Sequence, residues 1–181
     1  MEYLSFDYKY ENAGAMLCKA LEKQIKTPVE SLVLAFIGSD ANIGDSLAPL
    51  CGSLFKGDFG RVFTYGSLDL PITAKEVPYF ASFLQKTHPL STVIAIDAAI
   101  GKSEDVGLIK VQSCGIKPGL GVDKDLPKIG DFSIIGILGE KNGGKSRLTG
   151  RFSVVYNMAN VICCGLEKFL QNNENRLKNT L

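Results

Sequence analysis

Two kinds of hydrophobic pattern alternate along this chain. Segments whose apolar residues recur every three or four positions predict helices. These segments span residues 13–25, 45–55, 73–86 and 152–170. Short and nearly continuous apolar runs predict strands that are buried on both faces. These runs span residues 31–38, 61–65, 91–97, 106–113 and 132–138.

This alternation predicts the fold class. Strands that are buried on both faces and separated by helices form a mostly parallel sheet with helices covering each side. We therefore expect an α/β fold, namely a three-layer α/β/α sandwich. A length of 181 residues with 45% hydrophobic residues suits one domain over residues 1–181. The polar residues 171–181 predict a frayed end.

Composition narrows the classes of partner and the location. Lys+Arg 20 against Asp+Glu 19 gives a net charge of +1, so we expect neither a nucleic acid nor a membrane surface as partner. The apolar runs are shorter than the roughly 20 residues that a membrane span requires. The first residues have no basic and apolar signal pattern, so the expected location is the cytoplasm. Nothing in the sequence indicates the oligomeric state.

The cysteines and the histidine add little chemistry. Five cysteines without a C-x-x-C spacing argue against a disulfide framework and a zinc site, so we expect reduced thiols. Helical patterns place Cys51, Cys163 and Cys164 in the core, and Cys114, in a Gly-rich loop, has the best case for reactivity. The single histidine, His88, is expected in a solvated loop.

The predicted topology directs attention to two aspartates. Open α/β sheets bind ligands beyond the carboxyl ends of the strands, where the strand order reverses. If the predicted strand 31–38 lies between strands 61–65 and 91–97, this crevice separates 31–38 from 91–97. Asp97 then ends the strand 91–97, and Asp45 begins the helix that follows the strand 31–38. Neighbouring strands in a sheet lie about 4.8 Å apart, so the two aspartates could face each other. Such a pair shares a proton, so one carboxyl can activate water while the other protonates a leaving amine.

Structural roles for the same residues stay open. Asp45 suits the N-cap of a helix, and Asp97 suits a strand end that is bonded to backbone amides. Asp40 and Asn42 suit a turn.

Serines accompany the aspartates on the strand-end loops. These loops hold Ser39, Ser67 and Asp69. A Ser-His-Asp triad would need the single histidine, His88, and we do not expect His88 to take part in one.

A phosphate-binding pattern stands near the C-terminal end. GEKNGGKS, residues 139–146, fits G-x-x-x-x-G-K-[ST] and raises the alternative of a nucleotide hydrolase. A phosphate loop runs directly into its helix, however, and here residues 147–150 intervene. We expect a solvated connection between the strand 132–138 and the last helix.

Four motifs in order resemble a known family. GSDANIGDSLAPL (38–50), TYGSLDLPI (64–72), VIAIDAAIG (93–101) and VQSCGIKPGLGVDKDLPKIGD (111–131) are similar to those of YyaC-type sporulation proteins (DUF1256-like). Through that family the chain resembles the spore germination protease and, more distantly, the hydrogenase maturation endopeptidases. The resemblance covers residues 31–139.

The resemblance implies a phosphorylase/hydrolase-like fold and peptide-bond hydrolysis without a covalent intermediate. The two essential carboxylates of the germination protease fall on Asp45 and Asp97. The hydrogenase endopeptidases use a histidine to bind nickel, and no motif loop here holds one, so we expect no metal and no cofactor. The resemblance also implies a location in the mother cell or forespore of a spore-forming bacterium.

The residues expected to bind or position a peptide or protein substrate lie in the same loops. They are Ser39, Asp40, Asn42, Ser67, Pro118, Gly119 and Gly121. The Pro-Gly-x-Gly loop exposes backbone groups that suit an extended peptide or an oxyanion, and it equally suits a wide turn. Two functions stay open, an aspartate-dependent peptidase of sporulation and an inactive protein of the same fold that binds or regulates.

Overall fold

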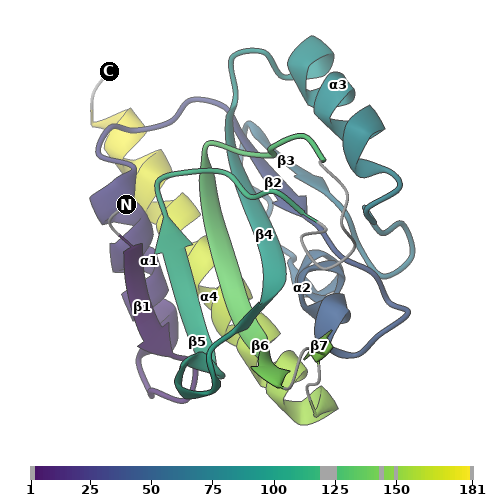
Figure 1. Ribbon diagram of the computed structural model, residues 1–181. Coiled ribbons are helices and arrows are strands. Elements are labelled where there is room, and N and C mark those ends of the chain that lie inside the picture. Colours follow the sequence, from purple (N-terminus) through teal and green to yellow (C-terminus); the bar gives the residue numbers. More distant parts are fainter. Residues whose placement is uncertain (1–2, 119–125, 143–144, 149–150, 180–181) are drawn as a thin grey trace.

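A computed structural model describes residues 3–118, 126–142, 145–148 and 151–179 (Figure 1). In this described part, seven strands form one sheet in the order β1-β5-β6-β4-β2-β3, with β7 paired to β6. The strands are β1 (Tyr3–Asp7), β2 (Leu32–Phe36), β3 (Val62–Tyr65), β4 (Thr92–Gly101), β5 (Leu108–Gln112), β6 (Phe132–Asn142) and β7 (Lys145–Leu148). The helices are α1 (Ala13–Gln24), η1 (Gly44–Ser46), α2 (Leu47–Leu54), α3 (Val77–Thr87), η2 (Ser103–Asp105) and α4 (Phe152–Lys178), of which η1 and η2 are short 3-10 helices.

The centre of the sheet is parallel. β3, β2, β4 and β6 run in one direction, while β5 pairs antiparallel with both β6 and β1. The order β3-β2-β4 confirms that the strand predicted over 31–38 lies between those predicted over 61–65 and 91–97. The predicted crevice therefore corresponds to the boundary between β2 and β4.

Two hydrophobic clusters cover the two faces of the sheet. On one face, Leu34 and Ile96 pack in a cluster with residues of α1, α2 and α4. On the other, Val33 and Ala95 pack with α3 and with Ile129 of the segment after β5. Figure 1 shows α3 separated by the sheet from the other three long helices. The fold is the expected three-layer α/β/α sandwich, because neighbouring residues of each central strand face opposite layers.

The N-terminal strand β1 was not predicted from the sequence. Its residues pair with β5 from Tyr3↔Gln112 to Asp7↔Leu108, at the edge of the sheet. Of its described side chains only Phe6 is fully buried, since an edge strand needs few apolar residues. The hydrophobic pattern is consequently too weak to distinguish this strand from a loop.

The prediction of a frayed end over 171–181 was wrong for residues 171–178, because α4 continues to Lys178. Asn173 is 5% exposed and fixes this last part of the helix. Its side chain accepts a hydrogen bond from the Val29 N–H and donates one to the Val29 carbonyl, both at 2.9 Å. A polar residue in a polar segment thus anchors the helix to the loop before β2.

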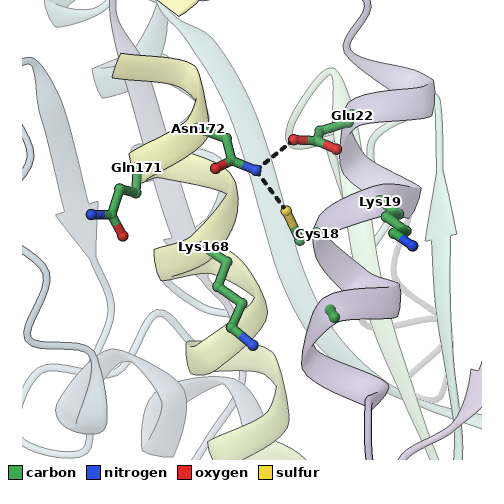
Figure 2. A pocket seen from close by; sticks show the side chains of 7 residues that line it. Cys18, Lys19, Glu22, Lys168, Gln171 and Asn172 are labelled. Atoms are coloured by element: carbon green, nitrogen blue, oxygen red, sulfur yellow. Dashed lines mark hydrogen bonds between the residues drawn. The ribbon is translucent and has the colours of Figure 1, made fainter. Parts of the chain in front are cut away.

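Asn173→Ala is expected to lower the free energy of unfolding by about 2–3 kcal/mol, since both backbone groups of Val29 lose their partner. Asn172→Ala is the matched control on the same helix. Figure 2 shows that Asn172 donates to Glu22 Oε1 (2.8 Å) and Cys18 Sγ (3.6 Å) at the surface, so its loss should cost less than about 1 kcal/mol. Urea unfolding of the three proteins measures both values, and equal losses would contradict an anchoring role for Asn173.

Candidate functional site

The predicted crevice lies where β2 leaves its neighbour β4. The last register pair of the two strands is Phe36↔Ile96, and the Ile37 N–H donates to the Ile96 carbonyl at 2.9 Å. β4 then continues alone beside β6, with Asp97 opposite Ile135. Asp97 is therefore the first residue of β4 that β2 no longer covers. It lies inside the strand rather than at its end, because β4 extends to Gly101.

Asp97 combines partial burial with a single described hydrogen-bond partner. Alternation along β4 places its side chain on the face that carries Val93 and Ala95, between the α3 layer and the segment after β5. The Ala98 N–H donates to Asp97 Oδ1 at 2.7 Å. Burial raises the pKa of Asp97 well above its usual range, the Ala98 bond lowers it, and the charge of Asp45 raises it further. The folded protein therefore favours the protonated form of Asp97.

Asp45 reaches the same place from the other strand. It lies in η1, between β2 and α2, and is half-buried. Burial raises its pKa, and the backbone N–H of Ser39 opposes that shift. In the described structure neither η1 nor α2 has a side-chain cap, and their N-cap residues are Ile43 and Ser46. The interpretation of Asp45 as a helix N-cap was therefore wrong, and its carboxyl is available for other chemistry.

Gly38 permits the turn that carries Asp45 back over the end of β2. A Cβ atom at this position would lie 2.3 Å from the backbone oxygen of Asp45 and 3.0 Å from Pro49 Cδ. The Ser39 N–H donates to the same Asp45 oxygen at 3.2 Å. The turn closes only because residue 38 has no side chain.

Gly38→Ala is expected to move Asp45 and to destabilise the protein by about 1–3 kcal/mol through overpacking. Removal of the Asp45 charge from the crevice should lower the pKa of Asp97, which carboxyl NMR titration measures. Gly107→Ala is the control, because Gly107 (φ 97°) imposes backbone strain on an alanine but its Cβ would meet nothing nearer than 3.6 Å. An unchanged pKa of Asp97 in Gly38→Ala would show that the glycine does not position Asp45.

The other loop residues that the sequence singled out have structural contacts. Ser39 Oγ accepts from the Ala41 N–H (3.2 Å), and the Asn42 carbonyl accepts from the Ser46 N–H (3.0 Å). Asp40 and Asn42 are exposed on the same loop. Ser67 Oγ accepts from the Leu70 N–H at 3.1 Å. Ser39, Asn42 and Ser67 thus shape the turns around the crevice, and Asp40 faces solvent beside it.

The Pro-Gly-x-Gly loop is described only in part. Pro118 is buried, whereas Gly119 and Gly121 lie outside the described residues. On either side of this loop, Ile116 and Ile129 form an antiparallel bridge with two N–H···O bonds of 2.9 Å. Both isoleucines belong to the cluster on the Asp97 face of the sheet. The loop therefore starts and ends on the face toward which Asp97 points.

The expectation of a solvated His88 was wrong. The side chain is buried, and its Nε2 lies 2.7 Å from the Tyr65 hydroxyl. The rings of Phe63 and Phe83 lie 4.6 and 5.8 Å from the imidazole. These contacts join residues that are distant in sequence, so the local polar pattern gave no sign of them. His88 precedes β4 at its amino end, away from the crevice.

The cysteines follow the prediction except at one position. All five are free thiols, and Cys51 and Cys163 are buried as expected, but Cys164 is exposed. Cys164 lies on α4 between the buried residues Cys163 and Gly165. Successive residues of a helix point in different directions, so Cys164 faces solvent although its neighbours are buried. Cys114 is half-buried, with its Sγ 3.5 Å from Gln112 Oε1.

The described residues of GEKNGGKS lie in two paired strands and not at the start of a helix. β6 continues to Asn142, and β7 returns from Lys145 with pairs Glu140↔Arg147 and Asn142↔Lys145. The expected solvated connection over 139–146 was therefore wrong in its backbone conformation. A phosphate loop leads directly into a helix, whereas the described residues 139–142 pair with residues 145–148 in the sheet.

A separate hollow of about 280 Å³ lies between α1 and α4 (Figure 2). Cys18, Glu22 and Lys168 line it together with Ala15, Lys19, Gln171 and Asn172. Burial and the nearby Glu22 raise the pKa of Cys18 to about 11, so its thiol stays protonated and is a poor nucleophile. This hollow has no feature that assigns it a chemistry.

The described part of the chain also bears on metal binding and membrane insertion. Within it, no three His, Cys, Asp or Glu side chains come together closely enough to hold a metal ion. None of its helices has both the length and the apolar character of a membrane span.

Comparison with known proteins places this site in a family. Residues 5–165 match the family model described as "Protein of unknown function (DUF1256)". The chain belongs to the DUF1256 family. It is also 36% identical over 159 residues to the uncharacterized protein YyaC of Bacillus subtilis (strain 168), covering 81% of this chain and 78% of that protein. Asp45 and Asp97 both lie within the DUF1256 match, as does the whole crevice.

Proposed function

We propose that this DUF1256 protein is a peptidase in which Asp45 and Asp97 hydrolyse a peptide bond by acid-base catalysis. The observation that carries the proposal is the position of the two residues, which come from separate elements where β2 leaves β4, and the charge of Asp45 contributes to the raised pKa of Asp97. Neither forms an ion pair or a helix cap in the described structure that would account for its burial. Partly buried carboxyls that raise each other's pKa are characteristic of functional sites.

The two environments give the carboxyls different roles. Asp97, whose pKa is raised further than that of Asp45, keeps its proton more readily and is the general acid. Asp45, which is partly solvated and faces the Ser39 N–H, is the general base. Asp45 takes a proton from water as the water oxygen forms a bond to the peptide carbonyl carbon. When the C–N bond breaks, Asp97 gives its proton to the leaving nitrogen, and the two carboxyls exchange a proton through water to restore the initial state.

The motif resemblance supports the same assignment. The germination protease has its essential carboxylates in the motifs that correspond here to residues 38–50 and 93–101, which hold Asp45 and Asp97. A sporulation-associated endopeptidase is therefore the specific form of the proposal. Its location in the mother cell or forespore belongs to the same proposal.

The test is digestion of a proteome-derived peptide library by the full-length protein, with new termini identified by mass spectrometry. We expect cleavage at a restricted set of sites, and no cleavage by Asp45→Asn. An undigested library, or the same products from Asp45→Asn, would reject the peptidase and leave a protein that binds through this fold.

A further inference from the structure

Large apolar side chains stand exposed in the two loops beside the aspartate pair. Ile43, two residues before Asp45, is 50% exposed, and Leu68 and Leu70 in the loop after β3 are 36% and 78% exposed. A single exposed leucine is ordinary, whereas a group of apolar side chains next to a crevice indicates a binding surface. We call these three residues the apolar rim.

Hydrogen bonds hold two residues of the apolar rim, Leu68 and Leu70, in a defined turn. The Ser67 N–H donates to the Leu70 carbonyl at 3.2 Å, and the Leu70 N–H donates to Ser67 Oγ at 3.1 Å. The Leu68 N–H donates to Ser53 Oγ of α2 at 2.9 Å. Leu70 is therefore presented to solvent by an ordered backbone, which lowers the entropy cost of binding against it.

The rim is continuous with the aspartate pair. Ile37 and Ile72 form a parallel bridge, and the Gly38 N–H donates to the Ile72 carbonyl at 3.0 Å. The loop that presents Leu68 and Leu70 thus ends against the residue at which the loop of Asp45 begins. The turn that holds Leu68 and Leu70 is therefore joined by backbone contacts to the start of the Asp45 loop.

The same two loops carry negative charge. Asp40 and Asp69 are both exposed, and neither belongs to an ion pair found among the described residues. The next charged residues, Lys75 and Glu76, interact with each other, so they offset one another. Together with Asp45, the two aspartates make this side of the crevice favourable for a cation and unfavourable for an anion.

We infer that the substrates are extended peptides in which an apolar side chain neighbours a basic one. The apolar side chain packs against Ile43, Leu68 and Leu70, and the basic one faces Asp40 and Asp69. This inference rests on the proposed peptidase function, because that function supplies a peptide as the occupant of the crevice. The substrate class is defined by apolar contact with the rim and by charge complementarity with Asp40 and Asp69.

The test measures peptide binding separately from cleavage. Four fluorescent octapeptides share a Gly/Ser sequence and differ at two adjacent central positions, which are Leu-Lys, Ser-Lys, Leu-Glu or Ser-Glu. Binding is measured by anisotropy with full-length Asp97→Asn, which keeps the peptides intact, and cleavage is measured with the wild type. We expect the Leu-Lys peptide to bind at least about tenfold more tightly than each of the others.

Leu70→Ser, added to Asp97→Asn, should lower affinity for the Leu-Lys peptide about tenfold and leave the Ser-Lys peptide unchanged. Leu90→Ser is the matched control, because Leu90 is 95% exposed but precedes β4, at the opposite end of the strand from the crevice. Asp69→Asn should reduce the preference for Lys over Glu, and so should added salt.

The outcomes separate this inference from the peptidase function. Equal binding of the four peptides, or equal effects of Leu70→Ser and Leu90→Ser, would overturn the substrate class even if the wild type cleaves them. Selective binding that depends on Leu70, with no cleavage by the wild type, would retain the binding surface and reject the peptidase.

Discussion

Asp97→Asn is expected to slow peptide cleavage by about 10²- to 10⁴-fold, the usual contribution of a general acid. The amide has nearly the shape of the carboxyl and can still accept the Ala98 N–H bond (2.7 Å), so the protein should remain folded. It has no proton of suitable acidity for a leaving nitrogen. The measurement is kcat/KM on a substrate found in the library digest, with circular dichroism to verify the fold.

Asp131→Asn is the matched control for this substitution. Asp131 Oδ2 accepts the Val93 N–H at 2.8 Å near the amino end of the same strand, and an amide oxygen can keep that bond. Its cleavage rate should equal that of the wild type. Asp45→Asn should lose activity to a similar extent as Asp97→Asn. The double variant with both substitutions should lose little more activity than either single variant, because the effects of residues that act as a unit are not additive. Full activity of Asp97→Asn would remove Asp97 from the mechanism.

Asp97→Asn is also expected to stabilise the folded protein at neutral pH. The carboxyl of Asp97 has a raised pKa in the folded state and an ordinary one of about 3.9 in the unfolded state. As the pH rises above about 4, the unfolded chain releases a proton that the folded protein keeps. Wild-type stability therefore falls by up to about 1.4 kcal/mol per pH unit until the pH passes the folded pKa. Asp97→Asn has no such proton and escapes this loss.

Urea unfolding at pH 4, 5.5 and 7 measures the effect. The stability of Asp97→Asn relative to the wild type should increase with pH, and pH 4 is the internal reference because Asp97 contributes little there. Asp45→Asn should weaken the pH dependence, since the Asp45 charge helps to raise the pKa of Asp97. A stability difference that is constant across this range would contradict a raised pKa at Asp97. Higher stability together with lost activity would be typical of a functional residue.

The sequence predicts the centre of this fold well for a physical reason. β2 and β4 are buried on both faces, so residues such as Leu34 and Ala35 are apolar without interruption and the strands are evident. β1 lies at an edge and needs few apolar residues, and the β6–β7 hairpin has glycines and lysines that are typical of a loop. Both depend on pairing between strands, which local pattern does not encode.

The site could be predicted only as far as topology determines it. The order β3-β2-β4 places Asp97 and the segment that carries Asp45 where the neighbouring strands β2 and β4 separate, and the charge of Asp45 raises the pKa of Asp97. The pattern could not show that Asp45 caps no helix, because that depends on the backbone of η1. Nor could it show that His88 is buried, since Phe63 and Tyr65 enclose it from a different strand.

The departure of β2 from β4 also has a consequence for the moment at which activity begins. Asp45 and Asp97 belong to different segments of the chain and interact only once Phe36 and Ile96 are paired in the sheet. A growing polypeptide that ends before β4 has Asp45 without Asp97. If the pair cleaves peptides, a newly made chain cannot do so until its central strands have associated. Folding itself then protects neighbouring nascent chains from premature proteolysis.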